Sequence, residues 1–206
     1  AQAGPTEDVR VRQAIAYALD RQTLIDALLE GYASPVNILG APPIFGYTDQ
    51  IEGYAYDPDK ARALLQEAGA EGATLEFLTS PSYNQAMVQA IQQMLQDVGL
   101  DVSISSSDQA TFLKRRHGDP ENAGSLAIGA WSCACQDADG IIFPLFRTGS
   151  IWAKYSNPAF DEAVDAARST LDEAKRKAEY ETAYQILRED VPGLGLYQVY
   201  ALYGAS

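Results

Sequence analysis

The sequence has few of the residues on which metal centres and catalytic sites are usually built. Among its 206 residues there is one histidine, His117, and there are two cysteines, Cys133 and Cys135. A zinc site needs further cysteine or histidine ligands, so we expect no metal and no other cofactor. The C-x-C spacing points the two side chains to opposite faces of an extended chain, and a disulfide between them would be strained.

Positive charge and long apolar runs are also scarce. The formal net charge is −13 at pH 7, and the longest basic run is Lys114-Arg115-Arg116. Binding to nucleic acid needs clustered lysine and arginine, so a nucleic-acid partner is not expected. No apolar run approaches the roughly 20 residues of a membrane-spanning helix. The N-terminal residues Ala1–Pro5 carry no visible secretion signal.

The remaining composition is that of one globular core. Hydrophobic residues make up 47% of the 206 positions, which predicts a single domain over residues 1–206. Helix starts are marked by capping residues, most clearly by Asp57-Pro58 and Asn157-Pro158, where proline occupies the first helical position. Apolar residues then recur at helical spacing. The predicted helices are 9–19, 21–30, 58–68, 87–98, 109–116, 139–146, 158–169 and 173–190.

Alternating or continuous apolar runs between these helices predict strands. The intervening segment 33–56 is rich in glycine, proline and tyrosine and is expected to be an ordered loop. Strands separated by helices favour an α/β fold, with a mixed sheet on which helices pack. The predicted strands are 73–79, 102–104, 125–131 and 194–203.

The segment 129–140 concentrates an indole, two sulfurs and two carboxylates just after a predicted strand. Open α/β sheets bind ligands at the ends of their strands. Trp131 offers a flat apolar face and an N–H donor. Asp137 and Asp139 either cap the following helix or face the ligand, and the sequence favours capping for at least one of them.

Other polar residues are expected to lie at the same edge. Tyr83 and Asn84, at the start of the helix that follows the first predicted strand, could hydrogen-bond a solute. Arg147, after the helix that follows the acidic loop, is either a helix C-terminal charge or a grip for a carboxylate. The residues predicted to contact a ligand are Trp131, Ser132, Cys133, Asp137, Tyr83 and Asn84.

Several segments share one resemblance, which extends over nearly the whole chain. They resemble the bacterial extracytoplasmic solute-binding proteins of the peptide-binding class, family 5, which feed ABC importers. The segment 129–140, which we call the Trp131 loop, is similar to that family's Gly-Trp-x-x-Asp-x-x-Asp-Pro-Asp signature. The segments that carry the resemblance are 8–21, 42–47, 56–65, 92–102, 129–140 and 157–161.

The resemblance implies a periplasmic or otherwise extracytoplasmic protein without catalytic activity. The two lobes of such a protein close on a peptide-like or other small polar solute. An ABC permease in the membrane then recognises the closed form. This chain resembles only the C-terminal lobe of the two-lobed periplasmic-binding-protein fold, and the first lobe is expected to be absent. An uncovered cleft face would also favour self-association.

The chain departs from the family pattern where peptide termini are held. The family's peptide binders pair the ammonium with a carboxylate three residues after the tryptophan, and here that position is Ala134. A loop arginine that grips the carboxylate is also missing, because no lysine or arginine occurs between Arg62 and Lys114. The ligand is therefore expected to be a modified peptide, a sugar, an opine or another polar solute.

Two other functions remain open at this stage. A thiol enzyme would use Cys133 or Cys135 as nucleophile and His117 as base, with an aspartate orienting the imidazole. Alternatively, the chain is a docking module that only contacts the permease or another protein.

Overall fold

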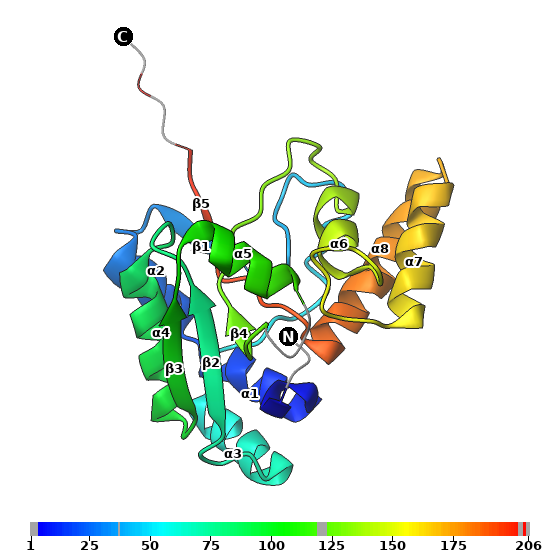
Figure 1. The fold of residues 1–206 in the computed structure, drawn as a ribbon. Coiled ribbons are helices and arrows are strands. Elements are labelled where there is room, and N and C mark those ends of the chain that lie inside the picture. The colour runs from blue at the N-terminus through cyan, green and yellow to red at the C-terminus, as the bar shows by residue number, and fades with distance from the viewer. Residues whose placement is uncertain (1–3, 37, 119–122, 202–203, 205–206) are drawn as a thin grey trace.

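The computed structural model describes residues 4–36, 38–118, 123–201 and 204. Its centre is a parallel sheet with strand order β3-β2-β4, formed by Asp101–Ser106, Thr74–Thr79 and Leu126–Ala127 respectively. Phe77 in β2 aligns with Ile104 in β3 and with Leu126 in β4. Parallel strands need crossover connections, and helices α4 (Gln85–Asp97) and α5 (Gln109–His117) lie on these connections (Figure 1).

A first hydrophobic core forms where helices cover this sheet. Helices α1 (Val9–Ala18), α2 (Arg21–Leu28) and α3 (Pro58–Ala68) join α4 in contributing buried side chains. Leu75 and Phe77 of β2 project into it. A short helix, η1 (Gly4–Glu7), precedes α1.

A second core lies beside the first and contains only helices and loop residues. It is formed by α6 (Asp139–Phe146), α7 (Pro158–Ser169) and α8 (Glu173–Asp190), on the right in Figure 1. Tyr180 and Tyr184 of α8 are fully buried there. The end of α8 joins the two cores, because Arg12 of α1 donates a 2.7 Å hydrogen bond to the backbone carbonyl of Asp190.

The two predicted helix starts marked by proline, at Pro58 and Pro158, are confirmed by their capping contacts, whereas the helix predicted from 87 begins at Gln85. The side chain of Asp57 accepts from the Lys60 amide at 2.9 Å, and that of Asn157 accepts from the Ala159 amide at 2.9 Å. Gly69 ends α3 in the left-handed conformation with φ of 64°. Such contacts join residues within one helical turn, which is why the sequence alone locates them.

The strand predictions need three corrections. The loop 33–56 contains a short strand, β1 (Ala33–Pro35), which pairs antiparallel with β5 (Tyr197–Val199). The predicted strand 125–131 is regular only in β4, and that at 194–203 only in β5, with 202–203 outside the described residues. Strand ends depend on pairing partners that a single sequence does not reveal.

None of the helices in the described ranges combines the length and apolarity needed to cross a membrane.

Candidate functional site

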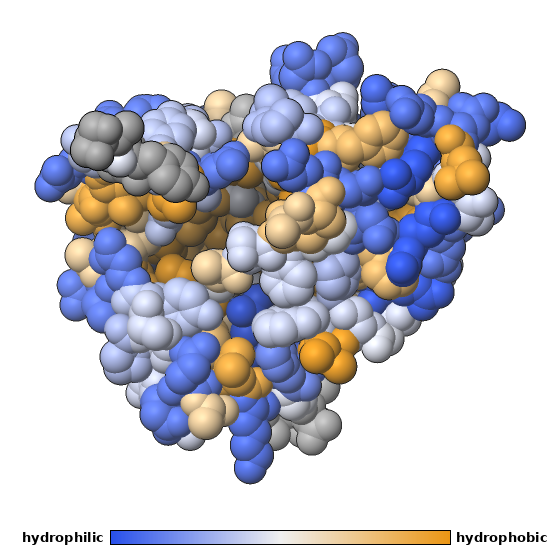
Figure 2. Space-filling model, turned by 90° about the horizontal axis from the view of Figure 1, so that it is seen from above, coloured by the Kyte–Doolittle hydropathy of each residue, from blue (hydrophilic) through white to orange (hydrophobic). Residues whose placement is uncertain are grey.

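Segments that follow the three parallel strands meet at one end of the sheet. Tyr83 lies just beyond β2, Arg116 and His117 lie in α5 beyond β3, and Trp131 lies beyond β4. Together with Trp152 from the loop between α6 and α7, we call these five residues the aromatic cluster. Seen from above (Figure 2), this face of the molecule also has a hollow in its left part, where hydrophobic side chains gather with hydrophilic ones around them.

The two tryptophans of the aromatic cluster contact each other edge to face. Their ring centroids are 5.3 Å apart, and the His117 ring lies 4.2 Å from Trp152. The Trp131 side chain also donates from Nε1 to the Gly140 carbonyl oxygen at 2.8 Å. Trp131 nevertheless keeps 37% of its surface exposed, so an indole face is held in place and open to solvent. Contact of Trp131 with a ligand stays a prediction.

Arg116 supplies the positive charge of the aromatic cluster. Its guanidinium carbon lies 5.7 Å from the centroid of the Trp152 ring. Gly129 leaves room for the guanidinium, because a Cβ at that position would lie only 2.7 Å from an Arg116 nitrogen. Burial lowers the pKa of Arg116, and the Tyr83 hydroxyl partly offsets this through a hydrogen bond. Among the described residues no carboxylate lies within ion-pair distance of Arg116.

His117 completes the aromatic cluster as a neutral ring. Burial lowers its pKa, and the positive charges of Arg116 and Lys154 lower it further. Its Nε2 atom is buried and has no hydrogen-bond partner in the described part of the structure. Lys154 donates to the His117 carbonyl oxygen at 3.0 Å and thereby fixes the C-terminal end of α5.

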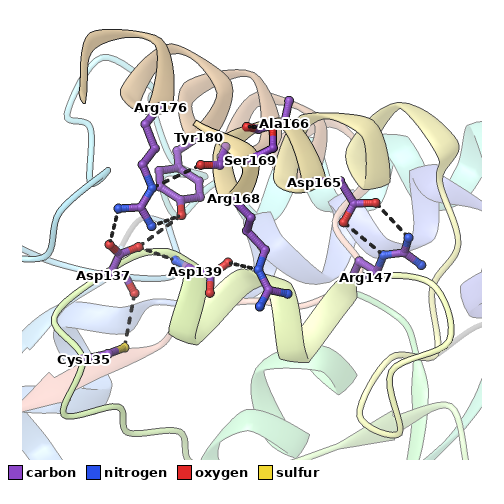
Figure 3. A network of polar contacts seen from close by, with 11 residues as sticks. Cys135, Asp137, Asp139, Arg147, Asp165, Ala166, Arg168, Ser169, Arg176 and Tyr180 are labelled. Carbon is purple, nitrogen blue, oxygen red and sulfur yellow. Dashed lines mark hydrogen bonds and ion pairs between the residues drawn. The ribbon is translucent and has the colours of Figure 1, made fainter. Parts of the chain in front are cut away.

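The two aspartates of the Trp131 loop face the interior of the protein (Figure 3). Asp137 forms an ion pair with Arg176 at 2.9 Å, accepts a hydrogen bond from Tyr180 at 3.1 Å and accepts the Asp139 amide at 2.9 Å. Asp139 pairs with Arg168 at 3.3 Å, and burial raises its pKa. Asp137 therefore takes the capping role through the first amide of α6, and its carboxylate is already engaged by three partners within the protein.

Comparison with known proteins identifies this architecture. Residues 1–152 match the family model described as "Bacterial extracellular solute-binding proteins, family 5 Middle". The chain belongs to the family 5 bacterial extracellular solute-binding proteins. This confirms the resemblance carried by the six segments and the α/β fold expected from them.

Individual relatives in this family are moderately similar in sequence. The dipeptide-binding protein of Escherichia coli K12 is 31% identical, over 92% of this chain and 37% of its own length. The glutathione-binding protein GsiB of Pectobacterium atrosepticum is 33% identical, over 93% of this chain and 39% of its own length. The chain thus spans about two fifths of the length of these relatives.

A solved structure shows how closely the fold agrees with that of a known protein. The periplasmic binding protein DppA from Helicobacter pylori, in complex with the peptide STSA, has a TM-score of 0.87 and 28% identity. The similarity covers 95% of this chain and 39% of DppA. The match extends over nearly all of this chain and over part of a longer protein.

For three of the remaining residues, contact with a ligand stays a prediction, and the structure gives only their surroundings. Tyr83 is half-buried and its ring is 5.4 Å from Phe112. Asn84 is exposed, and its side-chain oxygen caps α4 by accepting from the Met87 amide at 3.1 Å. Ser132 is exposed in the Trp131 loop.

Of the two roles predicted for Arg147, the structure shows the one that involves no ligand. Its guanidinium is 2.8 Å from the carboxylate of Asp165 in α7, and hydrogen bonding to that carboxylate raises the pKa of Arg147. A guanidinium already paired in this way is a poor grip for a ligand carboxylate.

The cysteines differ from the sequence-based expectation. Cys133 and Cys135 are joined by a disulfide, and the described residues contain no free cysteine. The thiol-enzyme alternative needs a thiolate nucleophile, so this structure does not support it. His117 also faces Trp152 rather than a sulfur. The described ranges contain no group of three or more histidine, cysteine, aspartate or glutamate residues placed to hold a metal ion.

Sequence reasoning missed Arg116 and Trp152. Arg116 was counted only as part of a basic run too short to bind nucleic acid, and Trp152 lies in a segment without periodicity. The available signal was that α5 follows a parallel strand, so its polar residues can reach the ligand-binding edge of the sheet.

The ion pair between Arg115 and Glu76 holds α5 against β2 at a distance of 2.7 Å. The Arg115 hydrogen bond holds the pKa of Glu76 below its usual value of 4.5. A lowered folded-state pKa stabilises the protein above the unfolded value, and this contribution disappears as the pH falls through the folded value. Glu76→Gln should therefore destabilise the chain at pH 7 and lose its effect once the pH has fallen below the lowered folded-state pKa of Glu76. Urea unfolding measures this, and Glu71→Gln is the matched charge change at an exposed position.

Proposed function

We propose that this chain is the second lobe of a two-lobed solute-binding protein that captures a small, polar, anionic solute. The solute would lie between the lobes, and an ABC permease would receive it from the closed form, outside the cytoplasm. The observation that carries this proposal is the position of Arg116 beside Trp152, whose ring contacts the partly exposed Trp131, beyond the ends of the parallel strands. Stacking on an indole combined with a cation suits a solute that has a flat part and a carboxylate.

The relatives support a peptide-like ligand. The names of two of them specify dipeptides and glutathione, and DppA was solved with a peptide. Such ligands end in a carboxylate, for which a bidentate guanidinium is a specific partner. The guanidinium of Arg116 has no such partner among the described carboxylates.

Recognition of a ligand ammonium group has less support in this chain. Ala134 replaces the family's anchoring carboxylate, and Asp137 is engaged by Arg176 and Tyr180. An unpaired buried ammonium would cost several kcal/mol. The solute class that fits best is therefore a peptide whose amino end is blocked or modified, or an acidic solute without an ammonium group.

Two measurements test this function in the two-lobed protein. Native mass spectrometry after gentle purification should reveal a co-purified anionic solute. Trp131→Ala should then weaken its binding about 10- to 30-fold, because an aromatic anchor contributes roughly 1.4–2 kcal/mol. Tyr56→Ala, at another exposed aromatic residue, is the control and should leave the affinity unchanged.

The alternative outcome is equally clear. If isothermal titration gives Trp131→Ala the same affinity as the unsubstituted protein, the Trp131 face does not contact the solute and the proposed site is wrong.

A further inference from the structure

The segment that carries Trp131 has little backbone support of its own. It joins β4 to α6, and at its far end Phe45 donates to Gln136 and accepts from Ala138 at 2.9 and 2.8 Å. Within the described structure, residues 129–135 form no backbone–backbone hydrogen bond. Exposed loops of this kind open easily unless side chains hold them. The position of Trp131 therefore depends on contacts made by side chains of the loop.

The disulfide and Trp131 both contact the same residue, Gly140. A Cβ at Gly140 would lie 2.1 Å from the Cys135 sulfur and 2.4 Å from the Cys133 sulfur, so the sulfurs pack directly on its backbone. The carbonyl oxygen of Gly140 accepts the Trp131 Nε1–H hydrogen bond at 2.8 Å. Gly140 belongs to the first turn of α6, which Asp137 and Arg176 tie to α8. The loop is thus fixed to a rigid element at one point.

We propose that the Cys133–Cys135 disulfide is a redox-sensitive positioning device for Trp131. Oxidised, it holds the loop compactly over Gly140 and presents the indole face. A dithiol reductant breaks the sulfur–sulfur bond, each sulfur gains an electron and a proton to become a thiol, and the reductant becomes its own disulfide. Once the bond is broken, the two thiol side chains can rotate apart, so the sulfurs no longer hold the loop over Gly140 and Trp131 becomes more mobile.

The location of the disulfide makes such control accessible. Cys133 and Cys135 are both exposed, so a small reductant can reach the sulfurs without unfolding the protein. Redox control of solute binding rests on the proposed function, whereas control of the Trp131 position does not. The experiment below therefore needs no ligand.

Tryptophan fluorescence measures the position of Trp131 directly. The sequence contains two tryptophans, so Trp152→Phe leaves Trp131 as the single indole while keeping an aromatic ring beside it. Reduction of this variant should shift its emission to longer wavelength and increase quenching by acrylamide, and re-oxidation should reverse both. The control adds Cys133→Ser and Cys135→Ser to the same variant. It should resemble the reduced form and not respond to the reductant.

Gly140→Ala provides an independent test of the packing. In the oxidised chain the added methyl group collides with two linked sulfurs that cannot move apart, so we expect cleavage by chymotrypsin after Trp131 to become about tenfold faster. In the chain with both serines the side chains can rotate away, and the same substitution should have little effect. This coupling between Gly140 and the cysteines is what a double-mutant cycle measures.

Two results would overturn the proposal. One is free thiols at both cysteines in the chain purified without reductant. The other is complete reduction, verified by alkylation and mass spectrometry, that leaves the emission, quenching and cleavage at Trp131 unchanged. A normal Trp131 response in a two-lobed protein that binds no anionic solute would contradict the proposed function alone.

Discussion

Replacing Gly46 by alanine is expected to lower the free energy of unfolding by about 3–5 kcal/mol, from an unfavourable φ together with overpacking. Gly46 is buried with φ of 82°, a left-handed conformation that alanine adopts poorly. A Cβ there would lie 2.4 Å from Cδ2 of Tyr180 and 3.1 Å from the Cβ of Ala138. Tyr180 cannot move aside easily, because it is fully buried and its hydroxyl donates to Asp137.

Gly69→Ala is the matched control for this substitution. Gly69 has φ of 64°, but no atom lies within 4 Å of its would-be Cβ. It should therefore cost only the conformational term, about 1–2 kcal/mol. Urea unfolding, followed by far-ultraviolet circular dichroism, measures both free energies. If Gly46→Ala is no more destabilising than Gly69→Ala, the close packing of Tyr180 against the loop is wrong.

Replacing Arg116 by alanine is expected to weaken the binding of an anionic solute to the two-lobed protein about 30- to 1000-fold. Loss of one partner from a buried, hydrogen-bonded charge pair costs about 2–4 kcal/mol. Arg116 meets these conditions because burial already lowers its pKa and Tyr83 fixes its orientation. Arg116→Lys keeps the charge but loses the planar fork, so it should restore only part of the affinity. Isothermal titration measures all three affinities.

The matched control for Arg116 lies on the same helix. Lys114 is exposed, and Lys114→Ala changes the net charge by the same amount two residues away. It should have little effect at physiological salt, because exposed charges are screened. A ligand derivative with a carboxamide in place of the carboxylate should bind equally to the Arg116→Ala and unsubstituted proteins. Equal losses from Lys114→Ala and Arg116→Ala would show a general charge effect and contradict a direct contact.

The candidate site was only partly predictable because its members approach from different loops. Trp131 could be located from the motif around it, and the structure leaves its face exposed. The same motif includes Asp137, yet this carboxylate turns toward Arg176 and Tyr180 of α8 (Figure 3). Neither partner is near it in the sequence. A motif fixes which residues lie in a loop, whereas packing fixes which way each side chain points.

The sequence by itself determined the family, the α/β class and the helix starts of this protein. Capping residues such as Asp57 and Asn157 accept hydrogen bonds from backbone amides two or three residues ahead, so these contacts can be predicted from the local sequence. The tertiary structure alone decided that Arg116 lies beside Trp152 and that the cysteine sulfurs rest on Gly140. These contacts join segments that are far apart in the sequence and meet only when the sheet and the second core have packed. The shape of that packing therefore determines which side chains touch.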